Sequence, residues 1–188
     1  MGEGNGLIDH LVYATPSLDV VDRLGIPVSP GGQHVGLGTR NFLADLGGGA
    51  YLEVIGPDPD QPDPPQPRPF DIDSLTGPRL VAWAVRVTDI GPDAIAMSRA
   101  RTDGVLLEWK LTPWVPGVLP FLIDWGTTPH PSRDAVHGSE LLSFHLTHPS
   151  PDEVHKGLSA LGVDVPVVEG APALVARIRT PQGEVTLR

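Results

Sequence analysis

The sequence predicts an α+β fold in which βαβββ modules are repeated and their strands form a curved, cupped mixed β-sheet with short helices outside. Short segments rich in β-branched residues show partly alternating polarity, which is typical of strands. The 188 residues include 22 glycines and 22 prolines, which favours many turns and short elements. The order strand, Pro-Ser, helix, Leu-Gly, strands occurs near the start of the chain and again from residue 141, which indicates an internal repeat.

The first module is expected over residues 7–56. It begins with a strand from Leu7 to Ala14, whose alternation would place Ile8, His10 and Val12 on one face. A short helix and three strands complete the module, at residues 17–24, 26–29, 39–46 and 50–55. Ser17 is suited to cap this helix, and a glycine follows its last residue.

Residues 57–78 are dense in proline and are expected to form an extended connection, because proline lacks the amide proton that helices and sheets require. The second module is expected over 79–131, with a shortened helix between its first two strands. The third is expected over 139–188, where Ser150 and Glu153 have the spacing of a capping box at the start of a helix. The three modules together would form one domain over residues 1–188.

Composition excludes several classes of protein. A net charge of −10 opposes binding to nucleic acid or to an anionic membrane, so a small molecule is the expected partner. Cysteine is absent, which excludes thiol catalysis and disulfides. The chain has no apolar run long enough to cross a bilayer, and the MGEGNG start does not have the pattern of a signal peptide, so a cytoplasmic location is expected. The motif GxxxxGK[ST] is missing, and no nucleotide cofactor is expected.

Several stretches resemble one known family: IDHLVYATPSL, GGQHVGLGTRN and AYLEVIGPDPDQP in the first half, and PRLVAWAVRVTDI, MSRARTDG and LPFLIDWGTTPHP in the second. Together they are similar to the glyoxalase-like domain of the vicinal oxygen chelate superfamily, over nearly the whole chain. Members of that superfamily include lyases, isomerases, ring-cleaving dioxygenases and antibiotic-binding proteins. The resemblance therefore implies a cup of βαβββ modules but does not fix the function.

The resemblance implies a site built on His10 and Glu53, which match the histidine of a first strand and the glutamate of a last strand, both facing into the cup. These two residues could hold one divalent metal ion, such as Zn, Ni, Mn or Fe, or act as a catalytic acid and base. The alternative is structural, with Glu53 bonded only to backbone or to an arginine.

The second half departs from the family pattern. Trp83 falls at the histidine position and Ile123 at the glutamate position, with Asp124 one residue along. A tryptophan side chain cannot bind a metal, and a shift of one residue reverses the facing of a strand side chain. A four-ligand metal site is therefore doubtful from the sequence alone.

Further candidates for binding a substrate are polar residues of a glycine-rich stretch, aromatic residues of the second module, one aspartate and one arginine. They are His34, Thr39, Asn41, Trp83, Arg99, Trp109, Phe121, Asp124 and Trp125. Aromatic walls would bind flat or apolar ligands, and an arginine facing the cup could bind an anion. The alternatives are a polar surface turn, ordinary core filling and a solvated loop charge.

Three functions remain open from the sequence. The first is an enzyme of the lyase, isomerase or dioxygenase type, with Glu53 and His10 as the catalytic pair. The second is a non-catalytic protein that binds or sequesters a cationic aromatic molecule and forms a homodimer. The third is a duplicated scaffold whose site has been lost, which the tryptophan at position 83 favours.

Overall fold

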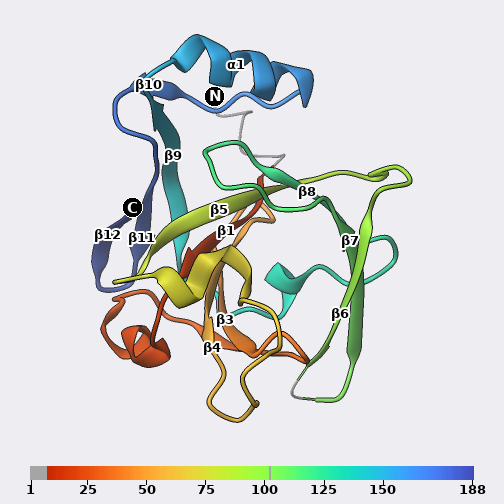
Figure 1. The fold of residues 1–188 in the computed structure, drawn as a ribbon. Coiled ribbons are helices and arrows are strands. Elements are labelled where there is room, and N and C mark those ends of the chain that lie inside the picture. Colours follow the sequence, from red (N-terminus) through yellow and green to blue (C-terminus); the bar gives the residue numbers. More distant parts are fainter. Residues whose placement is uncertain (1–7, 102) are drawn as a thin grey trace.

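Eight strands close into a barrel in the computed structural model, which describes residues 8–101 and 103–188 (Figure 1). They are β1 (Ile8–Ala14), β2 (Ser29–His34), β3 (Thr39–Asp45), β4 (Tyr51–Pro57), β5 (Arg79–Arg86), β6 (Ile95–Arg101), β7 (Leu106–Leu111) and β8 (Phe121–Asp124). The order around the barrel is β1-β4-β3-β2-β6-β7-β8-β5, and β5 pairs with β1 to close it. The predicted curved, cupped mixed sheet is confirmed. Leu7 and the MGEGNG start lie outside the described residues.

The barrel consists of two halves with the same strand order. In the first half β1 pairs in parallel with β4, and β3 and β2 follow. In the second half β5 pairs in parallel with β8, and β7 and β6 follow. The halves join through the antiparallel pairs β1–β5 and β2–β6. This matched order supports the predicted duplication.

The helices predicted after the first strand of each half are reduced to a short 3-10 helix in one half and are missing in the other. In the first half the connection is a 3-10 helix, η2 (Leu18–Arg23), whose preceding Ser17 accepts a hydrogen bond from the backbone N–H of Asp19. Gly25 ends this segment with a φ of 72°, in the region that favours glycine. The helix predicted between β5 and β6 is wrong. Those residues form turns around Gly91-Pro92, because the link is too short and too broken for a helix.

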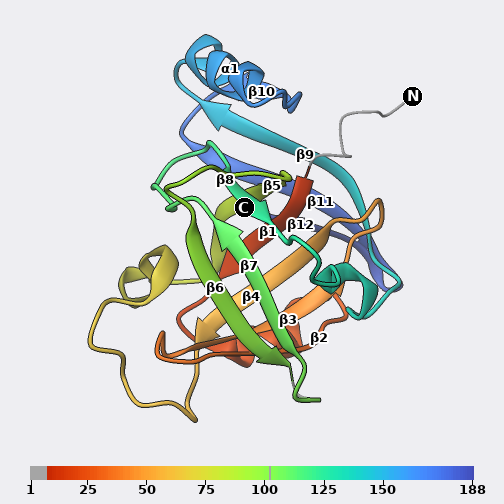
Figure 2. The same ribbon diagram turned by 90° about the vertical axis from the view of Figure 1, so that its right-hand side faces the viewer.

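The third unit has the predicted order of elements but a different sheet. Its elements are β9 (Glu140–His148), α1 (Pro151–Ala160), β10 (Val167–Glu169), β11 (Ala173–Thr180) and β12 (Gly183–Leu187). They form a separate sheet in the order β10-β9-β11-β12, which lies beside the barrel (Figure 2). The unit is therefore not a third copy of the barrel modules. The predicted capping box is also wrong, since the Ser150 side chain makes no capping hydrogen bond.

Two apolar clusters fill the molecule. One lies inside the barrel and includes Val12, Ala82, Ala84 and Phe121. The other includes Trp83, which is fully buried and meets Phe144 of β9 edge to face, with ring centroids 5.1 Å apart. The Trp83 indole N–H also donates to the carbonyl of Val118 at 2.8 Å. The second cluster therefore joins the barrel to the second sheet.

The proline-rich connection between β4 and β5 contains one helical turn, η3 (Pro69–Ser74), drawn in yellow in Figure 1. Arg68 fixes its start by bonding Asp63, Asp73 and the carbonyl of Gly38. Two turn residues, Phe70 and Asp71, have φ angles of 60° and 53° although neither is glycine, which strains the backbone. None of the described helices is long and apolar enough to cross a membrane.

Candidate functional site

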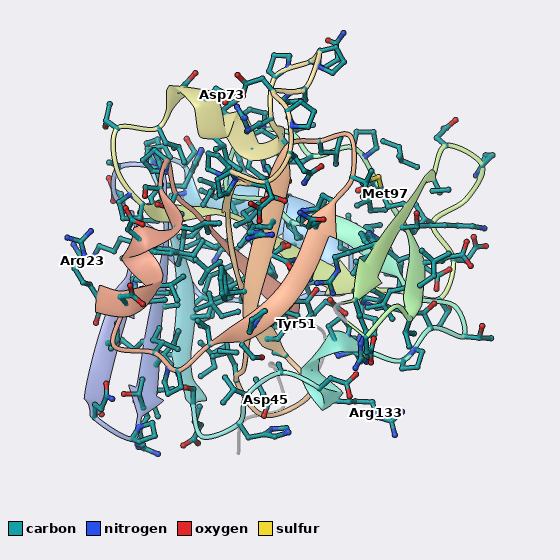
Figure 3. The ribbon with its side chains drawn as sticks, turned by 90° about the horizontal axis from the view of Figure 1, so that it is seen from below. Arg23, Asp45, Tyr51, Asp73, Met97 and Arg133 are labelled. Atoms are coloured by element: carbon teal, nitrogen blue, oxygen red, sulfur yellow. The ribbon has the colours of Figure 1, made fainter. Side chains whose placement is uncertain are left out.

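A cavity of about 230 Å³ lies within the barrel and has one polar region in an otherwise apolar wall. The polar side chains are His10, His34, Asn41, Tyr51, Glu53, Arg99 and Thr112. The apolar wall includes Phe70, Met97, Trp109, Trp114, Phe121, Ile123 and Trp125. Tyr51 on β4 and Met97 on β6, both labelled in Figure 3, mark two separate parts of this wall.

His10 is oriented by the carboxylate of Asp9, which is completely buried. The His10 Nδ1–H donates to Asp9 Oδ1 at 2.7 Å, because an ionised carboxylate can only accept. This bond leaves the other ring nitrogen, Nε2, facing Glu53. Tyr51 stacks on the imidazole with ring centroids 4.7 Å apart, which further fixes the ring. The arrangement sets both the tautomer and the direction of His10.

Asp9 itself is held by donors from both halves of the barrel. Arg86 Nε donates to Oδ2 at 2.7 Å, and the Trp125 indole donates to the same atom at 3.1 Å. His130, which accepts the Ser132 N–H at Nδ1, places its Nε2 3.0 Å from Oδ2 and 2.7 Å from Arg86 Nη2. Burial alone would raise the pKa of Asp9, but the hydrogen bonds and charges of the histidines outweigh it and hold that pKa far below its usual value. Asp9 is therefore a buried carboxylate that is ionised near neutral pH.

A β-bulge explains how Asp9 and His10 can both take part. The pairing of β1 with β5 shifts register between Ile8 and His10. Ile8 therefore packs in the apolar cluster that joins the barrel to the second sheet, while His10 faces the cavity. The predicted common face of Ile8, His10 and Val12 is therefore wrong at Ile8. Simple alternation fails here because the bulge inserts an extra residue.

Glu53 belongs to a chain of buried polar groups. Its Oε1 accepts from the Asn41 amide at 2.6 Å, and the oxygen of the same amide accepts from Arg99 Nη1 at 2.8 Å. The Asn41 amide orientation is thus fixed by a carboxylate on one side and a guanidinium on the other. Glu53 Oε2 receives no hydrogen bond from the described residues and lies 3.8 Å from His10 Nε2.

His34 and Thr39 support this chain from behind. The Asn41 amide also lies 3.4 Å from His34 Nε2, and His34 Nδ1 bonds the hydroxyl of Thr39 at 3.0 Å. Burial lowers the pKa of His34, although the nearby Glu53 charge opposes the shift. His34 is therefore neutral near pH 7, with its Nε2 as an acceptor and its Nδ1–H donated to Thr39.

Arg99 is only 4% exposed and lies in β6, not in the loop-like stretch that the sequence suggested. The segment is a strand because it pairs with β7 and β2, although Ser98, Arg99 and Arg101 give it the polar composition of a loop. Gly31 of β2 provides the space beside it: a Cβ there would lie 2.5 Å from Arg99 Nη1 and 2.2 Å from the Asn41 Oδ1 atom. Burial lowers the Arg99 pKa, as expected for a desolvated cation.

Three of the predicted binding residues do not line the cavity. Trp83 faces the second sheet, and the residue that pairs with His10 is Ala84. Asp124 lies outside the wall and accepts the N–H of Gly126, since Ile123 takes the inward position. Thr39 is fully buried behind His34. The other predicted residues, from His10 and Glu53 to Trp109, Phe121 and Trp125, surround the cavity.

The residues present do not fit the four-ligand metal site that the resemblance implies. The strand pairs His10–Tyr51 and Ala84–Phe121 are equivalent in the two halves, which makes Ala84 the counterpart of His10 and Ile123 the counterpart of Glu53. Neither side chain can bind a metal. Among the described residues, no group of three or more His, Asp or Glu side chains is arranged to hold a metal ion.

Several residues of the site were not predicted. Tyr51 and Met97 could have been found, because each stands two residues before a predicted site residue on the same strand and therefore shares its face. The position of Asp9 beside the site depends on the bulge, and no pattern in the neighbouring sequence indicates its role. Phe70 and Trp114 come from segments without periodicity and meet edge to face, with ring centroids 5.4 Å apart.

Comparison with solved structures gives the fold. A structure described as a hypothetical protein from Staphylococcus aureus has a TM-score of 0.61 and 14% identity, with 95% of this chain and 84% of that chain covered. A Mn(II)-bound glyoxalase from Novosphingobium aromaticivorans has a TM-score of 0.47 and 10% identity, with 96% and 81% covered. A fusion of a xylose isomerase-like TIM barrel with a 4-hydroxyphenylpyruvate dioxygenase has a TM-score of 0.42 and 14% identity, with 97% and 32% covered.

Sequence comparison gives the family. None of the curated proteins matches the chain. The family model described as the glyoxalase-like domain matches residues 8–162, which span the whole barrel and continue into the third unit. The two matched halves of the barrel and this match agree with the resemblance seen in the sequence. The chain belongs to the glyoxalase-like domain family.

Proposed function

We propose that the chain is an enzyme that binds a small carbonyl compound in the barrel cavity and moves a proton on it. The observation that carries the proposal is the pair formed by Glu53 Oε2 and His10 Nε2. These atoms lie 3.8 Å apart, at the polar region of the cavity. At this spacing a substrate atom cannot lie between the two groups, but one atom placed to the side can approach the carboxylate and the imidazole together.

The two groups have separate tasks. The free oxygen of Glu53 would accept a proton from the carbon next to the carbonyl, while Asn41 holds the other oxygen. His10, in its imidazolium form stabilised by the buried Asp9, would donate the Nε2 proton to the carbonyl oxygen and take it back when Glu53 returns a proton to the carbon. The aromatic wall would exclude water from the reacting carbon.

Proton transfer can be measured before the natural substrate is known. Phenylacetaldehyde and phenylacetone, which carry hydrogen on the carbon between ring and carbonyl, would be incubated with the protein in D2O, and NMR would follow deuterium entering that carbon. Glu53→Gln should slow this exchange by at least about 100-fold, since it removes the base and keeps the shape. Glu184→Gln, at a half-exposed surface ion pair with Arg177, is the matched control and should leave the rate unchanged. Exchange that is equally fast in the Glu53 variant would overturn the proposal.

An aromatic cavity also suits a protein that binds a small molecule without changing it. The same variant separates the two functions. In a binding protein, Glu53→Gln would weaken the affinity for a ligand, and the wild-type protein would catalyse no exchange. In the enzyme, the exchange depends on Glu53 while the ligand still binds.

A further inference from the structure

Arg99 is a buried cation without a carboxylate partner of its own. Of its three nitrogens, only Nη1 makes a hydrogen bond to a described residue, the Asn41 amide oxygen. The guanidinium forms no ion pair with any carboxylate in the described part of the chain, in contrast to Arg101 two residues later, which pairs with Asp103 and Asp134. A buried charge is costly unless it is paired, and Arg99 is one of the residues that line the cavity.

Glu53 does not take the place of that missing partner. Asn41 stands between the two charges, with its amide nitrogen on Glu53 and its amide oxygen on Arg99. The guanidinium fork therefore stays open toward the cavity, where a planar two-oxygen group can accept two parallel hydrogen bonds. The sequence favoured a cationic ligand because the protein is acidic, but the positive charge of Arg99 would repel a cation in this cavity.

The size and lining of the cavity limit the rest of the ligand. A dry cavity of about 150 Å³ is enough for benzene, so 230 Å³ has room for one ring and a short polar arm. Trp109, Trp125 and Phe121 provide flat apolar surface for such a ring. Trp109 and Trp125 are themselves in contact, with ring centroids 5.3 Å apart.

We propose that the ligand is a small monocyclic aromatic carboxylate, whose carboxylate binds Arg99 and whose ring lies among the tryptophans. The proposal rests on the function proposed above and names its substrate class. Because Arg99 and Glu53 contact the same Asn41 amide, a carboxylate bound to Arg99 would hold the ligand close to Glu53. Proton transfer would occur at a carbon of this ligand that is next to its carbonyl group.

Three probes of nearly equal shape test the charge: phenylacetate, phenylacetamide and 2-phenylethylammonium. Their affinities would be measured by titration calorimetry and by quenching of tryptophan fluorescence. Phenylacetate should bind the wild-type protein about ten-fold or more tightly than the amide, because a hydrogen bond to a charged group is worth more than a neutral one. The ammonium compound should bind most weakly. Equal binding of all three, tighter binding of the cation, or no binding of phenylacetate would overturn the proposal.

Variants then locate the charge that the carboxylate uses. Arg99→Gln should remove the preference for phenylacetate and keep the affinity for the neutral amide, which shows that the cavity is intact. Gly31→Ala retains the positive charge but crowds Arg99 Nη1 and Asn41, and should weaken phenylacetate binding to a smaller degree. Arg101→Gln is the matched control. A carboxylate preference that survives in Arg99→Gln contradicts the proposal. If that variant does not fold, the affinities of the three probes for the wild-type protein decide the question.

The outcome is separable from the proposed enzyme activity. Selective binding of phenylacetate without deuterium exchange at any probe would support the ligand class and end the proton-transfer function. If neutral carbonyl compounds exchange deuterium in a way that depends on Glu53, and carboxylates do not bind preferentially, the proton-transfer function is supported and the proposed ligand class is ruled out.

Discussion

The two halves of the barrel share one strand order but carry different chemistry. The first half supplies Glu53, Asn41 and His34, which are connected by buried hydrogen bonds, and His10, whose Nε2 lies 3.8 Å from Glu53 Oε2. At the positions equivalent to His10 and Glu53 the second half has Ala84 and Ile123. Apart from Arg99, its cavity-facing residues are mostly aromatic or aliphatic. One duplicated frame thus provides a reactive wall and a binding wall.

The residue before each cavity position shows how this difference arises. Asp9 precedes His10 at a β-bulge and forms the hydrogen bonds that orient it. Trp83 precedes Ala84 and faces outward, where it packs against the second sheet. The same sequence position therefore serves the site in one half and the assembly of the fold in the other.

Trp83→Ala should have the largest effect on stability. Loss of a fully buried tryptophan typically costs about 3–5 kcal/mol, since it leaves a cavity and an unpaired Val118 carbonyl. Urea unfolding would measure the change. Trp109→Ala is the matched variant on the cavity side: it should weaken phenylacetate binding and lower stability less. A Trp83 variant that loses affinity but not stability would contradict the outward placement.

Asp9→Ala should cost roughly 3 kcal/mol of unfolding free energy, because it removes the anion that pairs with Arg86, accepts from His10 and Trp125, and contacts His130. Glu184→Ala, which breaks a half-exposed ion pair, should cost less than about 1 kcal/mol. Similar losses in the two variants would show that Asp9 does not hold the two halves together.

The equivalence of the halves can be tested by making them alike. In the double variant Ala84→His, Ile123→Glu, the second half would offer the same ligand types as His10 and Glu53. Mn²⁺, Ni²⁺, Zn²⁺ or Fe²⁺ should then raise the free energy of unfolding by about 2.7 kcal/mol at 100 times the dissociation constant. We expect the wild-type melting temperature to stay unchanged with these metals, and the single Ala84→His variant is the control. If the same metals stabilise the wild-type protein as much as the double variant, the conclusion that its residues do not fit a metal site is refuted.

The smallest expected effect is a pH dependence from the first half. Burial lowers the pKa of His34, so below about pH 6.5 the unfolded chain binds a proton that the folded protein does not. Stability from this group is present above the unfolded pKa and falls as the pH is lowered from 7 to 5. His34→Gln should flatten the melting temperature over this range, compared with the exposed His137→Gln. If the stability of the wild-type protein rises as the pH is lowered, and His34→Gln removes this dependence, the pKa of His34 is raised and not lowered by folding.

Much of the first half could be predicted from the sequence. Local spacing identifies the strands around His10 and Glu53, and comparison of LEVIG with LIDWG correctly pairs Glu53 with Ile123. The equivalent comparison failed at Trp83, because it aligned VYATP with VRVTD, whereas the strand pairs place the two segments one residue apart and make Ala84 the counterpart of His10. Phe70 was also missed, since its position depends on a proline-rich connection anchored by Arg68.

The family, most of the order of the elements and the unequal distribution of polar residues between the halves follow from residue types and short-range spacing, so the amino-acid sequence is enough to predict them. The closure of the cup into a barrel, the different strand order of the third unit and the burial of Arg99 beside Asn41 became visible in the folded structure alone. These outcomes depend on pairing between strands far apart in the chain. A change of one residue in register reverses which side chains face the cavity, and local periodicity does not record it.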